Sequence, residues 1–93
     1  MPEFRIYYQP LVYEDIAGIN RTNLIRIEKA IGQKLATSPQ TYGLPLRGTL
    51  KKYWKLRVGD YRVIFKMKPQ IITVLLIAHR KKVYDLATKR LAR

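Results

Sequence analysis

The sequence predicts a single α+β domain spanning residues 1–93, with a mainly antiparallel sheet, two N-terminal helices on one face and a short C-terminal helix. A chain of 93 residues has room for one hydrophobic core, and its apolar fraction of 47% is that of a globular protein. Helical spacing of apolar residues occurs early in the chain and at its end, whereas strand patterns fill the region between. Alternating residues around a Gly-Asp pair supply the clearest strand signal.

The first part of the chain predicts one strand followed by two helices. Residues 4–8 (FRIYY) are aromatic and β-branched, which is typical of a strand. Residues 11–17 predict a short helix, and a second helix runs from a cap at Asn20 or Thr22 to about Ala36. We expect the two helices to form an αα-hairpin on one face of the sheet. The second helix carries an apolar stripe of Leu24, Ile27, Ile31 and Leu35.

Residues 53–67 (YWKLRVGDYRVIFKM) predict a β-hairpin with a two-residue turn at Gly59-Asp60. This turn makes Arg57 the direct cross-strand neighbour of Arg62. Like charges placed opposite each other destabilise a sheet, so we expect an anion to sit between them. The other side of the hairpin is apolar and is expected to build the core, from Trp54, Leu56, Val58, Tyr61, Val63 and Phe65.

The remaining segments complete the sheet and add the last helix. A turn-rich connector, residues 37–43, leads to a short edge strand at residues 44–46. Residues 71–78 (IITVLLIA) are apolar at almost every position and predict a central strand covered on much of both faces. Residues 83–91 have a helical pattern, with Tyr84, Ala87 and Leu91 near one stripe.

The positive charge is large and unevenly distributed. The formal net charge is +13. Residues 1–46 hold five basic and four acidic side chains, whereas residues 47–93 hold fourteen basic and two acidic ones and therefore carry +12 of the total. The excess indicates a polyanionic partner, either nucleic acid or a strongly acidic protein.

Several classes of protein are excluded by what the sequence lacks. The chain has no cysteine for a disulfide or a thiolate metal site, which fits a reducing cytosol. The N-terminus lacks the pattern of a signal peptide, and the longest apolar run is too short to span a bilayer, so we expect a cytoplasmic protein without membrane attachment. One histidine and six scattered acids do not supply a metal site, and no Gly-rich phosphate loop is present, so no metal or cofactor is expected.

Basic side chains are expected to converge on one side of the fold. Lys55, Arg57 and Arg62 share a face of the hairpin. Arg80 follows the central strand, and an antiparallel arrangement beside the Arg62 strand brings these two arginines close together. Tyr84 follows within about one helical turn. The alternative for the three hairpin side chains is a solvated surface, and for Tyr84 it is a place in the helix core.

The chemistry of this group suits a phosphodiester. Guanidinium groups make bidentate phosphate contacts and stabilise the extra charge of a pentacovalent phosphate. A tyrosine, or His79 before Arg80, is able to stack on an unpaired base, although His79 could equally pack on the sheet. Such a site cleaves RNA without a metal when the RNA 2′-hydroxyl is the nucleophile. Further cations are expected to form a field that attracts the polyanion, namely Lys51, Lys52, Lys81 and Lys82.

Three motifs together resemble the RelE/ParE superfamily of bacterial and archaeal toxins, and the RelE branch in particular. They are Leu46-Arg47-Gly48, then Lys55-Leu56-Arg57 followed by residues 59–65 (GDYRVIF), and residues 79–84 (HRKKVY). The resemblance spans nearly the whole chain. It implies a microbial-RNase-like fold with helices on one side of an antiparallel sheet. It also implies the toxin of a type II toxin–antitoxin pair, which cleaves messenger RNA in the ribosomal A site without a metal.

The resemblance also implies roles for individual residues. Arg62 matches the hairpin arginine that holds the scissile phosphate, and Arg80 matches the second catalytic arginine. Tyr84 matches the tyrosine that stacks on or orients the substrate nucleotide. Lys55 matches one residue of a lysine-rich strand, while Tyr53 stands where the best-studied members have a second lysine. The glutamate base of some relatives is not found on this face, so Lys55, His79 and Tyr84 all remain candidates for the proton acceptor.

Two other functions share the same fold and basic surface. One is a ParE-like inhibitor of DNA gyrase that acts through protein contacts and has no nuclease activity. The other is an RNA-binding module without catalysis. The toxin functions imply a cognate antitoxin, RelB-like and acidic, and the nuclease function adds messenger RNA and the ribosome as partners.

Overall fold

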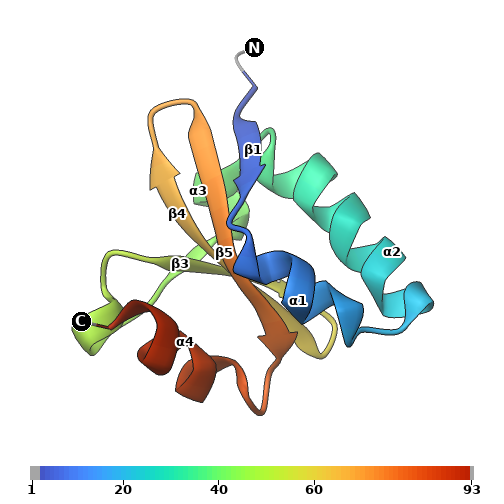
Figure 1. The fold of residues 1–93 in the computed structure, drawn as a ribbon. Coiled ribbons are helices and arrows are strands. Elements are labelled where there is room, and N and C mark those ends of the chain that lie inside the picture. The colour runs from blue at the N-terminus through green and yellow to red at the C-terminus, as the bar shows by residue number, and fades with distance from the viewer. Residues whose placement is uncertain (1–2, 93) are drawn as a thin grey trace.

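The computed structural model describes residues 3–92 and confirms the α+β fold. Five strands form one sheet in the order β1-β5-β4-β3-β2, and helices lie on both of its faces (Figure 1). The strands are β1 (Arg5–Tyr8), β2 (Leu44–Pro45), β3 (Trp54–Val58), β4 (Tyr61–Lys68) and β5 (Ile71–His79). The helices are α1 (Leu11–Ala17), α2 (Arg21–Ala30), α3 (Pro39–Tyr42) and α4 (Val83–Leu91), with a π-helical turn at Ile31–Leu35 and a 3-10 turn at Gly48–Leu50. Among the described residues, none of the helices has the length and apolar character that crossing a membrane requires.

The predicted hairpin is confirmed in its register. β3 and β4 pair antiparallel, with Val58 opposite Tyr61 and Arg57 opposite Arg62. Gly59 has a φ of +58°, a left-handed conformation that glycine adopts at low cost, and this explains why it begins the turn. The two like-charged arginines therefore lie side by side, as expected from the sequence alone.

β5 is an interior strand with one irregularity. It pairs antiparallel with β4 on one side and parallel with β1 on the other. Ile64 pairs with Leu76 and Phe65 pairs with Val74, so Leu75 is an extra residue without a partner in β4. An extra residue of this kind forms a β-bulge, which reverses the alternation of side chains along the rest of the strand. The side chains of residues 76–79 therefore lie on the opposite faces from those that the alternation of residues 71–74 predicts.

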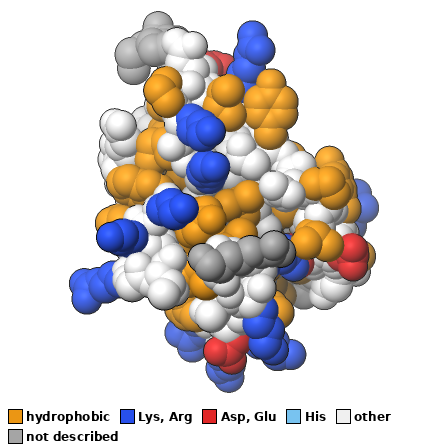
Figure 2. Space-filling model, turned by 60° about the vertical axis from the view of Figure 1, so that its left-hand side comes forward, with side chains coloured by type: hydrophobic (Ala, Val, Ile, Leu, Met, Phe, Trp, Pro, Cys, Tyr) orange, Lys and Arg blue, Asp and Glu red, His pale blue; other side chains and the backbone are white. Residues whose placement is uncertain are grey.

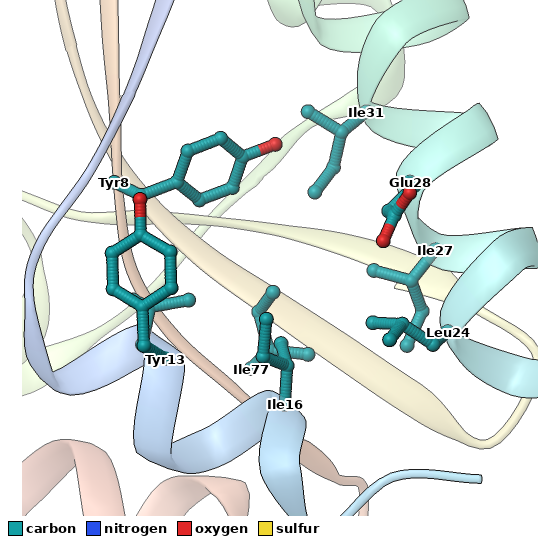
Figure 3. Close-up of a pocket in the computed structure, with 9 residues that line it drawn as sticks. Tyr8, Tyr13, Ile16, Leu24, Ile27, Glu28, Ile31 and Ile77 are labelled. Atoms are coloured by element: carbon teal, nitrogen blue, oxygen red, sulfur yellow. The ribbon is translucent and has the colours of Figure 1, made fainter. Parts of the chain in front are cut away.

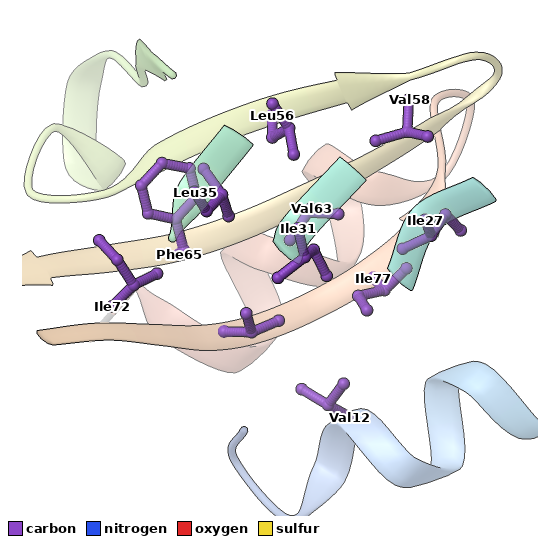
Figure 4. Close-up of a cluster of buried hydrophobic side chains, with 11 residues drawn as sticks. Val12, Ile27, Ile31, Leu35, Leu56, Val58, Val63, Phe65, Ile72 and Ile77 are labelled. Carbon is purple, nitrogen blue, oxygen red and sulfur yellow. The ribbon is translucent and has the colours of Figure 1, made fainter. Parts of the chain in front are cut away.

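The larger core lies between the sheet and the N-terminal helices (Figure 4). Asn20 caps α2, since its side-chain oxygen accepts a hydrogen bond of 2.9 Å from the Asn23 N–H. The helix continues through the π-helical turn to Leu35, close to the predicted end. The predicted stripe is buried except for Leu24, which is half-buried. The core residues are Val12, Ile27, Ile31, Leu35, Leu56, Val58, Val63, Phe65, Ile72, Val74 and Ile77.

A smaller core places α4 on the opposite face of the sheet. Its buried residues are Leu46, Leu50, Ile64, Leu76, Ala78, Val83 and Ala87. The expectation that all helices lie on one side is therefore wrong for α4. The physical reason is that β4 and β5 present apolar side chains on both faces, and the second face also has to be covered. The predicted stripe of α4 is corrected as well, because Val83 and Ala87 are buried while Tyr84 is 42% exposed.

The connector before the hairpin contains an element that the sequence did not predict, the one-turn helix α3. It ends at Gly43, which is buried against the core. A Cβ at this position would come within 2.6 Å of the Pro39 carbonyl oxygen and 2.8 Å of the Phe65 ring. Glycine is thus required here by the close approach of the chain to Phe65, before β2 takes its predicted place at the edge of the sheet.

An ion pair joins the two sides of the molecule at the bulge of β5. The guanidinium of Arg90, in α4, donates to both carboxylate oxygens of Asp15, in α1, at 2.9 and 3.0 Å. It also donates to the Leu75 carbonyl at 2.9 Å, while the Ile77 N–H donates to Asp15 at 3.1 Å. The hydrogen bond with Asp15 raises the pKa of Arg90 above its ordinary value. These contacts supply hydrogen-bond partners for the backbone groups of β5 at the part of its edge where β1 does not pair with it.

Candidate functional site

The basic side chains of the hairpin lie on the face that α4 covers. Lys55 pairs with Ile64, which belongs to the core under α4, and Arg57 pairs with Arg62 one step further along. Residues two apart on a strand point to the same side at a spacing of about 7 Å. Lys55, Arg57 and Arg62 therefore form a basic row beside α4. On the face seen in Figure 2, Lys and Arg side chains are numerous, while Asp and Glu are few.

Lys55 and Tyr84 are in direct contact although 29 positions separate them in the sequence. The Lys55 ammonium donates a hydrogen bond of 2.7 Å to the Tyr84 hydroxyl and lies 5.1 Å from the centre of its ring. The pair forms part of the wall of a groove of about 350 Å³, together with Pro45, Leu46, Arg47 and Leu50. The groove thus has an exposed aromatic ring beside an ammonium group and a guanidinium-bearing residue.

Arg47 is a residue of this groove that was not predicted from the sequence. It lines the groove with Lys55 and Tyr84. The next residue, Gly48, has a φ of +63°, so the chain turns sharply just after Arg47. Arg47 and Gly48 belong to the Leu46-Arg47-Gly48 motif noted in the sequence. The place of this motif after the predicted edge strand did not reveal that Arg47 borders the same groove as Tyr84.

Arg62 and Arg80 both contact the Gly59-Asp60 turn, which is consistent with the antiparallel arrangement that was expected. Nη1 of Arg62 donates to the carbonyl oxygens of Gly59 and Tyr61, both at 2.9 Å. The backbone N–H of Arg80 donates to the Asp60 carbonyl at 2.7 Å, and its Nε lies 3.8 Å from the Asp60 carboxylate. The Arg80 side chain is 56% exposed, so a phosphate is able to compete for it with Asp60.

His79 does not join this group. It pairs with Tyr61, whose ring packs against the larger core, and the two ring centres are 5.6 Å apart. Its side chain therefore points to the face opposite Arg62, and its Nδ1 accepts a hydrogen bond of 3.2 Å from the Lys81 N–H. The bulge at Leu75 is the reason, because it reverses the alternation that relates His79 to the earlier residues of β5. The placement leaves Lys55 and Tyr84 as the candidates for proton transfer that lie at the groove.

The other predicted residues flank the basic row or support it. Lys51 and Lys52 follow the 3-10 turn, and Lys81 and Lys82 lie between β5 and α4; all four are exposed. Tyr53 is half-buried against the smaller core, so the position where relatives have a second lysine is occupied here by a packing side chain. Among residues 3–92, no group of three or more metal-ligating side chains lies close together.

A second groove, of about 330 Å³, lies between α1 and α2 on the opposite face (Figure 3). Its walls are mostly apolar, and its polar groups are the hydroxyls of Tyr8 and Tyr13 and the carboxylate of Glu28. Burial raises the pKa of Tyr8, and Glu28 and Tyr13 add to the effect. A groove whose lining has one carboxylate and no basic side chain does not suit an anion, so of these two grooves the one beside Lys55 is the better suited to an anionic ligand.

Residues 6–84 match the family described as the ParE toxin of the type II toxin–antitoxin system parDE. The chain belongs to this toxin family. Membership places this toxin in the RelE/ParE superfamily, as the motifs in the sequence indicated. Comparison with curated protein sequences gives no match.

Solved structures confirm that this toxin has the fold of the superfamily. The toxin–antitoxin complex RelBE2 from Mycobacterium tuberculosis contains a chain 21% identical, with a TM-score of 0.79, covering 86% of this chain and 100% of that one. The RelB-RelE complex from Methanococcus jannaschii has 20% identity and a TM-score of 0.69 over 86% and 96% of the two chains. A mutant of the E. coli toxin RelE in its free state has 20% identity and a TM-score of 0.69 over 98% and 99%.

Proposed function

We propose that this toxin belongs to the RelE branch and is a metal-independent endoribonuclease that cleaves messenger RNA on the ribosome and so inhibits translation. The observation that carries the proposal is the convergence of Lys55, Tyr84 and Arg62 on one face of the hairpin, with Arg80 at its turn. A protein that acts only through surface contacts has no need to hold two like-charged arginines side by side, because the pair costs stability. A bound phosphate removes that cost.

The side chains at this site match the steps of a reaction in which the 2′-hydroxyl of the RNA attacks the adjacent phosphate. The 2′-oxygen attacks the phosphorus and loses its proton, the bond to the 5′-oxygen breaks, and that oxygen takes up a proton, leaving a 2′,3′-cyclic phosphate. Arg62 and Arg80 supply donors for the charge that develops on the phosphate oxygens. Lys55 and Tyr84, 2.7 Å apart, are the two groups at the groove that are able to carry a proton. The exposed ring of Tyr84 supplies a surface for a base to stack on.

The partners in this proposal are the ribosome with its messenger RNA and a cognate RelB-like antitoxin, and the place of action is the cytoplasm. The net charge of +13 supports an antitoxin with acidic segments. Toxin-like chains of this fold have been solved in complexes with antitoxins, which supports an antitoxin partner. The second candidate, a ParE-like inhibitor of DNA gyrase, is favoured by the description of the family that matches.

The proposed function predicts cuts in messenger RNA when the purified toxin is added to a translating extract. The measurement is primer extension across a defined transcript, with the same RNA in a ribosome-free reaction as the control. EDTA in the ribosome-free reaction inhibits metal-dependent nucleases, so that cleavage by such contaminants is distinguished from cleavage by the toxin. Intact messenger RNA together with loss of DNA supercoiling by purified gyrase would contradict the nuclease and support the ParE-like alternative.

Tyr84→Phe is expected to lower the cleavage rate by about 10-fold, the value of one hydrogen bond to a charged group. The substitution keeps the ring but removes the oxygen that Lys55 contacts. Single-turnover cleavage of the same transcript measures the rate. Tyr42→Phe is the matched control, because Tyr42 is also exposed and also lies near a lysine, Lys34, 5.3 Å from its ring centre. Equal rates for the two variants would show that the Tyr84 hydroxyl takes no part.

A further inference from the structure

Three arginines, one from β4 and two from segments distant in the sequence, contact the Gly59-Asp60 turn. Arg62 donates to the Gly59 carbonyl, and Arg80 contacts Asp60 through its backbone N–H and its side chain. The third is Arg26, in α2, whose guanidinium lies against Gly59. A Cβ built on Gly59 would come within 3.0 Å of Nη1 and 3.2 Å of Nη2 of Arg26. The Gly59-Asp60 turn is thus contacted by three guanidinium groups.

Gly59 makes this arrangement possible in two ways. Its φ of +58° forms the turn, and its missing side chain leaves the space that the Arg26 guanidinium occupies. Figure 4 shows the segment of α2 that bears Ile27, the neighbour of Arg26, at the turn end of the hairpin close to Val58. Burial of Ile27 in the core fixes this end of α2 over the turn, so the position of Arg26 follows from packing.

The charges at the turn are not balanced. Within the part of the chain that the structure describes, Asp60 is the one carboxylate that an arginine of this cluster contacts, and its partner is Arg80. Among residues 3–92, the ion pairs are Arg80 with Asp60 and Arg90 with Asp15, and the guanidinium of Arg26 makes no side-chain hydrogen bond. Three positive charges against one negative charge favour the binding of an anion, and planar guanidinium groups suit a phosphate.

We propose that Arg26 is a further RNA-binding residue, which with Arg62 and Arg80 forms a phosphate clamp around the Gly59-Asp60 turn. The inference rests on the proposed function, because RNA is the source of the phosphate. In this clamp Arg26 contacts the backbone phosphate next to the one that is cleaved, while Arg62 and Arg80 contact the scissile phosphate. The strand then runs from the groove of Lys55 and Tyr84, past Arg62, around the turn and towards α2. The RNA path therefore leaves the α4 side at the tip of the hairpin.

The test is the salt dependence of RNA binding by the intact toxin. The probe is a short single-stranded RNA with 2′-O-methyl groups, which cannot be cleaved because the attacking hydroxyl is blocked. Fluorescence anisotropy at a series of KCl concentrations yields the slope of log K against log salt. Arg26→Gln is expected to lower the magnitude of this slope by about 0.7, the value of one phosphate contact to a single strand.

Arg21→Gln is the matched control, because it removes the same charge from the same helix at an exposed position where no contact with the turn is present. Its slope is expected to equal that of the wild type. A wild type that binds the RNA, with Arg26→Gln and Arg21→Gln equal in slope, overturns the clamp and leaves the proposed function standing. A wild type that neither binds this RNA nor cuts messenger RNA in the translating extract overturns the proposed function and the clamp with it. A wild type that cuts in the extract but does not bind the free RNA overturns the clamp alone. Thermal unfolding of each variant confirms that the fold is retained.

Discussion

Arg62→Ala is expected to lower messenger RNA cleavage by at least about 100-fold, the usual loss when one donor to a developing negative charge is removed. Arg62 lies beside Arg57 and at the turn that Arg80 also contacts, and the proposed function assigns to its guanidinium the stabilisation of the phosphate in the transition state. Loss of activity is expected without loss of fold. The substitution removes two hydrogen bonds to backbone carbonyls, but it also relieves the like-charge contact with Arg57, so stability is expected to change by no more than about 1 kcal/mol.

Primer extension in the translating extract measures the cleavage by Arg62→Ala, and urea unfolding measures its stability. Arg5→Ala is the control, because Arg5 is also a strand arginine but is exposed and lies in β1, at the other edge of the sheet. Arg62→Lys keeps the charge and loses the planar fork, and we expect it to remain at least about 10-fold below the wild type. If Arg62→Ala were folded and cut as well as Arg5→Ala, the assignment of the site would be wrong.

Asp15→Ala is expected to lower the free energy of unfolding by about 3 kcal/mol, the lower end of the cost of removing one partner from a buried ion pair, because this pair is partly buried. The side chain of Asp15 is only 9% exposed, and its loss leaves the Arg90 guanidinium with the Leu75 carbonyl as its remaining acceptor. The Ile77 N–H loses its acceptor at the same time. The contact also holds α1, the bulge of β5 and α4 together, so its loss affects the attachment of the helix that bears Tyr84.

Urea unfolding monitored by fluorescence of the single tryptophan measures this effect. Glu14→Ala removes the neighbouring carboxylate, which is exposed, and is expected to change stability by no more than about 0.5 kcal/mol. The double variant Asp15→Ala/Arg90→Met is expected to be less destabilised than the sum of the two single variants, because it no longer buries an unpaired charge. Equal stability of Asp15→Ala and Glu14→Ala would show that the ion pair contributes nothing.

Local rules account for the parts of the fold that were predicted. The two-residue turn at Gly59-Asp60 sets the register of the hairpin, and the register separates the apolar face from Lys55, Arg57 and Arg62. The helical stripe of α2 was readable because its apolar residues recur every three or four positions. The proximity of Arg62 and Arg80 followed from the antiparallel pairing of two long strands. Each of these predictions depends on residues that are close in sequence or on the simplest pairing of neighbouring strands.

The misplaced residues share a different cause. His79 was expected at the basic site because it directly precedes Arg80, and no pattern in IITVLLIA reveals the bulge at Leu75 that sets the face of the later side chains. Tyr84 was assigned to the apolar stripe of its helix because the face that α4 buries depends on a core built from the other side of β4 and β5. Arg47 was overlooked because its neighbours in the groove, Lys55 and Tyr84, are distant in sequence.

The sequence by itself determined the α+β class, the hairpin register, the basic half of the chain and the identity of four candidate site residues, Lys55, Arg62, Arg80 and Tyr84. These follow from periodicity, turn chemistry and charge, which act over a few residues. Only the tertiary structure decided that α4 covers the second face, that Lys55 contacts Tyr84, that Asp15 holds Arg90 and that Arg26 reaches the Gly59 turn. Those contacts join segments that are far apart in the chain, and their geometry depends on one extra residue in β5 and on the packing of both faces of the sheet.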